Sequence, residues 1–313
     1  MPSLSVQQNL EPVRTHLENP SQPKLKLPRH ACDSHVHVFG PTSRFSYSKD
    51  RKITPLEAPK EKLFALHKQF GIERCVIVQS VIHGLDNSVV EDAMLAGQGA
   101  YLGIALVPAT VTDQELLRLA EVGFRGVRFN FMRHLSNDAS IEQVIDLTPR
   151  LKDVGMHLQV HFESSLVHEL GGWLVKSRVP VVIDHMGRVD AQKGSEHEDF
   201  QALLRLLENK LFNVKVSGID RIDAHAYKQE QADQRYRAGI EVARCLVERF
   251  PEQCVWGTDW PHPNHTHIPD DGVLVNALAS IATDQKLMEQ LLVLNPERLY
   301  RFESRVLSNN SNN

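Results

Sequence analysis

The sequence has few of the features that mark secreted, membrane or redox proteins. It contains only four cysteines, and none of them forms a C-x-x-C motif, so neither a disulfide scaffold nor a dithiol redox site is indicated. No segment reaches about 18 consecutive apolar residues, and residues 1–28 hold no apolar core of the signal-peptide kind. We therefore expect a cytoplasmic protein with neither a signal peptide nor a membrane span.

Strong charge is also lacking. The net charge is −4 and the isoelectric point is near 6.5, so no general attraction to nucleic acid or to an anionic membrane is expected. No G-x-G-x-x-G motif follows an early strand, which argues against an open nucleotide-binding sheet. With nucleic acid and membranes disfavoured, we expect the binding partner to be a small molecule. The sequence does not decide whether the protein forms a homo-oligomer.

What the sequence does contain is a repeated alternation of short apolar runs and helical segments. Runs of this kind are typical of parallel strands that are buried on both faces. Eight repeats in 313 residues favour closure into an α/β barrel of the TIM type, which needs about 250 residues plus insertions. The predicted strands are 31–38, 75–78, 102–107, 126–131, 157–162, 181–183, 212–216 and 254–256.

The segments outside the repeats define the predicted domain organisation. Residues 1–28 form an N-terminal arm, in which a short helix near 6–17 is one option. Residues 29–304 form the barrel domain, with a C-terminal helical extension over 284–302 that breaks at Asn295-Pro296, and 305–313 form a flexible tail. A long loop over 41–59 resembles the lids of other enzymes.

The first predicted strand carries the strongest chemical signal. His35 and His37 are two residues apart, so both side chains point to one face of the strand. Paired imidazoles of this kind can ligate a metal, although two hydrogen-bonded core histidines would give the same pattern.

Polar residues at the ends of the other strands favour the functional interpretation. Active sites of TIM barrels lie at the carboxyl ends of the strands, where residues distant in sequence converge. The candidates, in chain order, are His35, His37, Arg128, Asn130, His161, Glu163, Asp184, His185, Arg188, Ser217, Arg221, Asp259 and His262.

These residue types suggest a hydrolytic site. Neutral imidazoles and a carboxylate can hold Zn²⁺ with one position open for water, whose pKa then falls from 15.7 to roughly 7. Asp259 would ligate the metal or accept the proton of the water, and His185 would polarise the electrophilic carbonyl or steer the hydroxide. Arginines such as Arg128 and Arg188 suit a substrate carboxylate, whereas for Arg221 an internal salt bridge is an equal alternative.

Several motifs together resemble the amidohydrolase superfamily in its amidohydrolase 2 branch. They are DSHVHVFGP, GVRFN, DHMGR, GTDWPHPN and NPERLYRF, and the similarity spans about 31–302. Within that branch the sequence looks most like the lactonases that open pyrone dicarboxylates and the related sulfomuconolactone hydrolases. This resemblance implies a distorted barrel, catalytic residues at His35, His37, His185 and Asp259, and hydrolysis of a small acidic lactone from aromatic-compound catabolism.

The resemblance also bears on metal and substrate. Pyrone-dicarboxylate lactonases carry tyrosine where His161 stands and work without metal, whereas metal-dependent relatives carry a histidine ligand there. Ile53 and His134 stand where the pyrone enzymes carry a substrate-binding tyrosine and arginine, which argues against pyrone dicarboxylate itself and favours a related but different lactone. We therefore predict a divalent metal, zinc by ligand type, on His35, His37, His161 and Asp259.

Two more residues are candidate substrate contacts, and several other functions fit the same sequence. Tyr47, in the long loop, and His262 join Arg128, Arg188 and Arg221 as candidate substrate contacts. The alternatives are a metal-free lactonase, a decarboxylase of the same branch, a lactone isomerase and a non-catalytic binding barrel. Retention of four histidines with Asp259 argues against the last of these.

Overall fold

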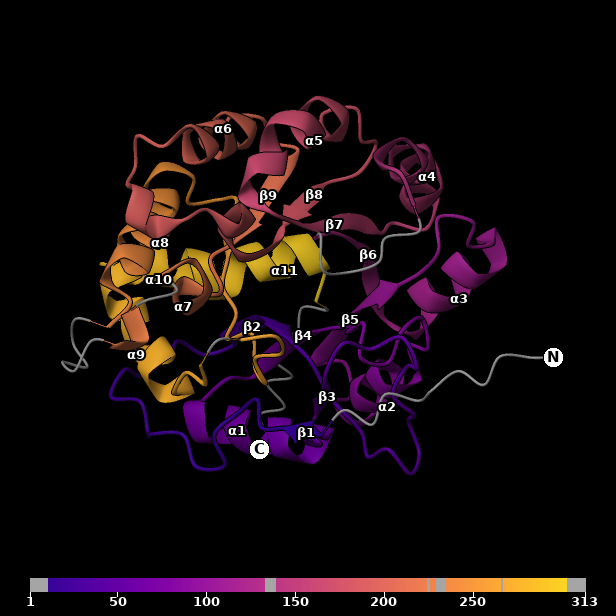
Figure 1. The fold of residues 1–313 in the computed structure, drawn as a ribbon, viewed down its shortest axis with the longest axis horizontal. Helices are drawn as coiled ribbons and strands as arrows, with labels where there is room; N and C mark the ends of the chain where they lie inside the picture. The colour runs from indigo at the N-terminus through magenta and orange to yellow at the C-terminus, as the bar shows by residue number, and fades with distance from the viewer. Residues whose placement is uncertain (1–10, 133–138, 224–225, 229–234, 266, 303–313) are drawn as a thin grey trace, which may run out of the picture.

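The computed structural model describes residues 11–132, 139–223, 226–228, 235–265 and 267–302. Within them, each predicted apolar run forms a strand of one parallel sheet, in the order β10-β9-β8-β7-β6-β5-β4-β2 (Figure 1). The predicted α/β barrel of the TIM type is therefore confirmed. Its strands are β2 (Cys32–Val36), β4 (Arg74–Val78), β5 (Tyr101–Leu106), β6 (Phe124–Phe131), β7 (His157–Phe162), β8 (Val181–Ile183), β9 (Phe212–Lys215) and β10 (Cys254–Val255).

Three backbone hydrogen bonds bring the first and last strands of the sheet together. Ser34 N donates to Trp256 O at 2.8 Å, His37 N donates to Trp260 O at 2.7 Å, and Asp259 N donates to His35 O at 2.8 Å. Gly257 permits this approach, because a Cβ at that position would lie 2.5 Å from His35 N. The barrel is thus nearly closed, and its closure aligns the HVH strand with the GTDW segment.

Helices surround the strands and bury their outward side chains (Figure 1). Along β4, Cys75 and Ile77 belong to the large outer core, whereas Val76 and Val78 belong to a second cluster in which Tyr300 also packs. This alternation is the expected consequence of a strand buried on both faces. The helices that follow the strands are α1 (Lys60–Phe70), α2 (Ser88–Ala96), α3 (Asp113–Val122), α4 (Ile141–Asp153), α5 (Val167–Leu174), α6 (Glu198–Leu207), α7 (Ile219–Ile222), α8 (Arg237–Arg249) and α9 (Asp271–Ile281).

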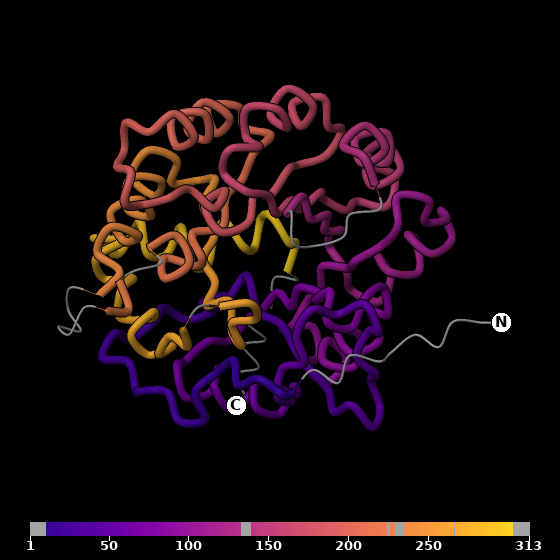
Figure 2. The backbone as a smooth tube through the Cα atoms, in the orientation of Figure 1, coloured from indigo at the N-terminus to yellow at the C-terminus, as the bar shows by residue number. Residues whose placement is uncertain are grey.

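The N-terminal arm lies against the barrel, beside the segment that carries α9 (Figure 2). Ser21 N donates to Asp270 Oδ1 at 2.9 Å, and Lys24 N donates to Asn276 Oδ1 at 2.8 Å. A helix over 6–17 is wrong for the described part of that range, since β1 (Pro12–Val13) is extended and pairs in parallel with β3 (Thr54–Pro55). Residues 1–10, the predicted tail 305–313 and His134 lie outside the described residues.

The C-terminal extension is helical, as predicted, but it does not break at Asn295. A π-helical turn, Gln290–Leu294, joins α10 (Gln285–Glu289) directly to α11 (Asn295–Tyr300). Asn295 Nδ2 donates to Pro251 O and Cys254 O, both at 2.6 Å, and so ties the start of α11 to β10.

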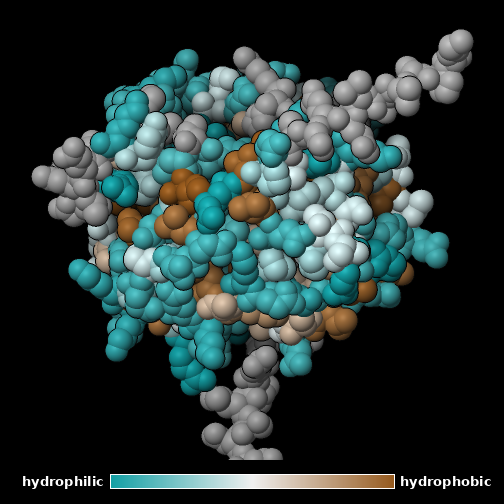
Figure 3. All heavy atoms as spheres, turned by 60° about the horizontal axis from the view of Figure 1, so that its bottom comes forward, coloured by the Kyte–Doolittle hydropathy of each residue, from teal (hydrophilic) through white to brown (hydrophobic). Residues whose placement is uncertain are grey.

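The face in Figure 3 is mostly hydrophilic, with hydrophobic residues in small separate groups. Among the residues that the structure describes, no helix has the length and apolarity needed to cross a bilayer.

Candidate active site

The two histidines of β2 lie at the carboxyl end of the barrel with their rings edge to face, 5.1 Å between centroids. His37 Nδ1 lies 2.7 Å from Val78 O, a carbonyl that can only accept. The proton of His37 is therefore on Nδ1, and the lone pair of Nε2 faces the site. Asp184 Oδ1 lies 3.3 Å from His35 Nδ1, which favours the same tautomer for His35.

Asp259 lies at the centre of the cluster. Its Oδ1 is 3.5 Å from His37 Nε2, 3.6 Å from His35 Nε2 and 3.8 Å from His185 Nε2. Its Oδ2 accepts from Arg221 Nε. Burial alone would raise the pKa of Asp259, but the Arg221 charge and the imidazoles hold it well below the usual value of 3.8. Asp259 is therefore ionised at neutral pH.

His185 approaches Asp259 from a tight turn after β8. Its backbone is left-handed, with φ of 48°, and Asp259 shares this conformation at φ 68°. His185 Nδ1 is 2.9 Å from Ser217 Oγ, which fixes the ring and leaves Nε2 toward Asp259. Burial, chiefly, lowers the pKa of His185 well below 6.5, so its imidazole is neutral at pH 7.

His161 is held apart from the other predicted ligands. Its Nδ1 is 3.2 Å from Asn130 Oδ1, on the neighbouring strand β6, and its Nε2 is buried without a hydrogen-bond partner in the described chain. Ligand atoms of His35, His37 and Asp259 all lie within 4.8 Å of one another, whereas His161 joins no such group among the described residues. The structure thus brings together three of the four predicted ligands.

A charged layer beneath these residues was only partly foreseen. Asp184 Oδ2 accepts from Arg128 Nε at 2.7 Å and from Gln159 Nε2 at 3.1 Å. Lys215, on β9, is fully buried; its Nζ donates to Ser34 O at 2.9 Å and lies 3.3 Å from His35 Nδ1.

Sequence reasoning missed Lys215, although it is a lone cation between two buried valines. Burial lowers the pKa of His35 to about 4, and the Lys215 charge adds to this effect. Lys215 therefore helps to keep His35 neutral and able to ligate or accept.

A cavity of about 50 Å³ opens onto this cluster. Its lining comprises His37, Ser80, Val81, Arg128, Met132, His161, His185, Arg188, Arg221, Asp259, Pro263 and Asn264. Arg188 has no hydrogen bond or ion pair to any described residue, whereas Arg221 is paired with Asp259 and donates to Pro263 O at 2.9 Å. The cavity therefore offers Arg188 as a cation that forms no direct ion pair with any described residue, although Asp259, Asp220 and Glu163 lie near enough to act on its charge.

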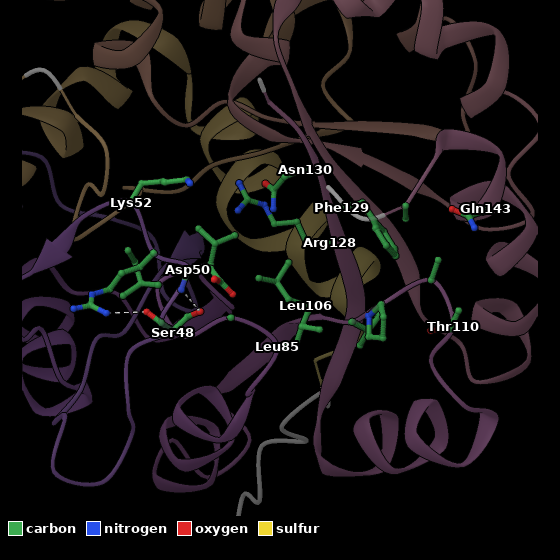
Figure 4. A pocket seen from close by; sticks show the side chains of 18 of the residues that line it. Ser48, Asp50, Lys52, Leu85, Leu106, Thr110, Arg128, Phe129, Asn130 and Gln143 are labelled. Carbon is green, nitrogen blue, oxygen red and sulfur yellow. Dashed lines mark hydrogen bonds between the residues drawn. The ribbon is translucent and has the colours of Figure 1, made fainter. Parts of the chain in front are cut away.

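A larger cavity of about 370 Å³ adjoins the first and shares Val81, Arg128 and Asn264 with it. Figure 4 shows Lys52, from the long loop, reaching toward the side where Arg128 and Asn130 lie. Ligand-sized space thus begins at the His/Asp cluster and runs out along the loop over 41–59.

Two predicted substrate contacts do not line either cavity. Tyr47 packs against His83, with ring centroids 5.0 Å apart, and its hydroxyl is buried without a hydrogen-bond partner in the described chain. His262 is fully buried, and its Nε2 lies 2.9 Å from Asp271 Oδ1. Neither side chain is therefore among the residues that line the two cavities.

Comparison with known proteins agrees with this geometry. A 2-pyrone-4,6-dicarboxylate hydrolase of Comamonas testosteroni is 40% identical over 285 residues, covering 90% of this chain and 93% of the relative. A 4-sulfomuconolactone hydrolase of Hydrogenophaga intermedia is 35% identical over 281 residues, covering 88% and 90%.

A similar solved structure is that of a probable 2-pyrone-4,6-dicarboxylic acid hydrolase from Acinetobacter baumannii, with citric acid bound. It superposes with a TM-score of 0.76 at 26% identity and covers 87% of this chain and 100% of that one. The amidohydrolase family matches residues 32–302, which include every strand of the barrel and every residue of the His/Asp cluster. This chain belongs to the amidohydrolase family.

Proposed function

We propose that the protein is a hydrolase that opens a small acidic lactone in aromatic-compound catabolism, by attack of an activated water on the lactone carbonyl. The observation that carries the proposal is the buried Asp259 carboxylate, whose Oδ1 has three imidazole Nε2 atoms within 3.8 Å. The cluster opens onto a cavity lined by arginines. The two relatives that are 40% and 35% identical are both named as lactone hydrolases, which supports the same reaction class.

Proton transfer is assigned to Asp259. Because its carboxylate is ionised and buried, it can take the proton of the attacking water and pass it to the leaving ring oxygen. Arg221 keeps one carboxylate oxygen occupied, so Oδ1 is the atom proposed to act. The products are a carboxylate and a hydroxyl on one opened chain, and no other reactant is needed.

His185 is assigned to the carbonyl. Ser217 Oγ–H can donate to His185 Nδ1, which puts the imidazole proton on Nε2. That N–H can then donate to the lactone carbonyl oxygen as negative charge develops on it. A neutral imidazole suits this role, because it donates without releasing its proton to bulk water.

The residues present fit a divalent metal. Asp259 Oδ1 and His35 Nε2 are buried without hydrogen-bond partners in the described chain, and with His37 they form a His₂Asp set. We propose zinc on these three residues, and His161 as a further donor from the same cavity, since its Nε2 is also without a partner. When bound, the ion would lower the pKa of a water molecule and polarise the carbonyl. In the metal-free alternative, Asp259 takes the proton unaided.

Substrate acidity is inferred from the arginines. Arg188 forms no direct ion pair with any described residue. Arg128 donates to Asp184 through its Nε, and its two terminal nitrogens remain available to a substrate. Both are proposed to bind a carboxylate or sulfonate, with Arg221 as a weaker candidate because its Nε and Nη2 already donate. The Acinetobacter relative was solved with citric acid, a tricarboxylic acid.

The test is a panel of lactones, assayed by proton release. It contains 2-pyrone-4,6-dicarboxylate, 4-sulfomuconolactone and a neutral lactone of similar size, each with and without chelator. We expect kcat/KM for one of the acidic lactones to exceed that for the neutral one by at least about 100-fold, since a buried cation is then paired. Failure to open any lactone, or release of CO₂ in place of ring opening, would overturn the proposal.

A further inference from the structure

A second buried cluster of histidine and aspartate lies outside the proposed catalytic residues. Asp220 comes from α7, and His262 and His265 come from the segment between β10 and α9. One ligand atom from each lies within 4.8 Å of the others. The side chains of Asp220 and His262 are fully buried, and that of His265 is 5% exposed.

Several polar atoms of this cluster make no hydrogen bond within the described chain. Neither oxygen of Asp220 makes a hydrogen bond within the described chain, and the same holds for His262 Nδ1 and His265 Nε2. Asp220 Oδ2 lies 2.5 Å from His265 Nε2 without hydrogen-bond geometry. Asp220 pairs with His265, but Asp220 Oδ1 and His262 Nδ1 remain buried without a partner in the described chain, and their burial favours a positively charged occupant.

The orientation of His262 suits a metal ligand. Its Nε2 lies 2.9 Å from Asp271 Oδ1, which places the ring proton on Nε2 and leaves the lone pair on Nδ1, the atom without a partner. A carboxylate that holds one ring nitrogen while the other faces an ion is the usual outer arrangement of metal-bound histidine. The contact with Asp271 is therefore explained by the site, whereas a substrate role would leave it unexplained.

We propose that Asp220, His262 and His265 form a second divalent-metal site, separate from the catalytic cluster and independent of the proposed function. Two imidazoles and one carboxylate favour zinc among the common divalent ions. Bound there, an ion fastens the loop after β10 to α7.

The position of the site gives it a consequence for the pocket. Arg221 is adjacent to Asp220 in α7, and it donates to Asp259 Oδ2 and to Pro263 O on the loop. An ion on Asp220 and His265 therefore holds both ends of the contact that fixes Asp259. We expect the site to be structural, since none of its three ligands lines the catalytic cavity.

The test measures bound zinc after equilibrium dialysis, by elemental analysis, in four proteins. They are the wild type, His37→Gln for the catalytic cluster, His265→Gln for the proposed site, and His168→Gln as a control from the surface group of His168, Glu198 and Asp199. We expect His265→Gln to lose one equivalent relative to the wild type, and His168→Gln to lose none. His37→Gln should retain the equivalent that His265→Gln lacks.

Each other outcome has a defined meaning. If His265→Gln is folded by circular dichroism and binds as much zinc as the wild type, the second site is wrong. If His265→Gln does not fold, Asp220→Asn repeats the test with a side chain of the same shape. If His37→Gln binds no zinc, the proposal is wrong, because this protein keeps Asp220, His262 and His265 unchanged.

The two metal proposals fail separately. Should the wild type bind one equivalent that only His265→Gln removes, the second site stands and the catalytic cluster holds no metal. A thermal scan gives a second readout, because zinc should raise the Tm of His37→Gln and leave that of His265→Gln closer to its metal-free value.

Discussion

Replacement of Asp259 by asparagine separates a chemical role from a structural one. Asn keeps the shape of the side chain and can accept a hydrogen bond from Arg221, but it cannot take a proton from water. Removal of one positioned acid–base group should lower kcat by about 10²–10⁴-fold, which corresponds to about 2.7–5.5 kcal/mol of barrier. The measurement is kcat for the best acidic lactone, alongside the Tm of the same preparation.

The stability cost of Asp259→Asn should be smaller than the catalytic loss. The Arg221 hydrogen bond changes from charge-assisted to charged–neutral, which costs about 1–2 kcal/mol in the free energy of unfolding. For a chain of this size that lowers Tm by only a few degrees, since about 1 kcal/mol shifts Tm by roughly 2–4 °C.

Asp33 provides the matched control. Its carboxylate accepts from Thr258 N at 3.0 Å, from Thr258 Oγ1 at 2.6 Å and from His35 N at 3.1 Å, so it braces the strand-closing turn without lining the cavity. Asp33→Asn should lower Tm at least as much as Asp259→Asn and should lower kcat far less. A folded Asp259→Asn protein with near-native kcat would show that Asp259 only braces the turn.

Four further predictions follow from the same contacts. Arg188→Met should lower kcat/KM for acidic lactones by about 10- to 150-fold, from about 1.5–3 kcal/mol of charged hydrogen bonding, and leave neutral lactones unchanged; an equal loss for both classes would make Arg188 structural. Chelation should abolish turnover, and added zinc should restore it; full activity in metal-free protein would favour the metal-free mechanism. Burial, aided by Lys215, lowers the pKa of His157 to about 3 in the folded protein, whereas the unfolded chain keeps about 6.5, so the unfolded state binds more protons at lower pH. The free energy of unfolding from urea titrations should therefore fall as pH drops from about 6.5 toward 3, and a flat profile would contradict a buried neutral His157. Gly257→Ala should lower Tm and activity together, since its Cβ would lie 2.5 Å from His35 N, whereas Gly172→Ala, with nothing within 4 Å of the added Cβ, should be neutral or stabilising.

The barrel was predictable because its strands are continuous apolar runs whose pattern differs from that of helices. Runs such as Val76–Val78 and Val181–Ile183 indicate strands that are buried on both faces. Eight such strands, alternating with helices, are compatible with only a few sheet topologies. The helix α9 was not predicted, because its start depends on Asp270, which accepts from Gly272 N, and on packing against α8. The π-helical turn before Asn295 was equally hidden, since it arises from a shift in backbone hydrogen bonding.

The sequence could predict which residues gather at the barrel mouth, but not which of them contact one another. Barrel topology alone brought His35, His37, His185 and Asp259 together. It could not show that Asn130 would engage His161 Nδ1, because that contact depends on the register between β6 and β7. Nor could it show that Arg221 would be paired with Asp259, or that Lys215 would lie under His35, since both contacts join residues distant in sequence.

The central claim is that water attacks the carbonyl of an acidic lactone at the Asp259 cluster, and isotopically labelled water tests it most directly. The wild type should open the acidic lactone in labelled water and place one heavy oxygen in the new carboxylate and none in the new hydroxyl, as read by mass spectrometry of fragments. The Asp259→Asn protein should give the same product at a rate about 10²–10⁴-fold lower. An unlabelled isomer of the substrate, a decarboxylated product, or label in the hydroxyl would contradict the account.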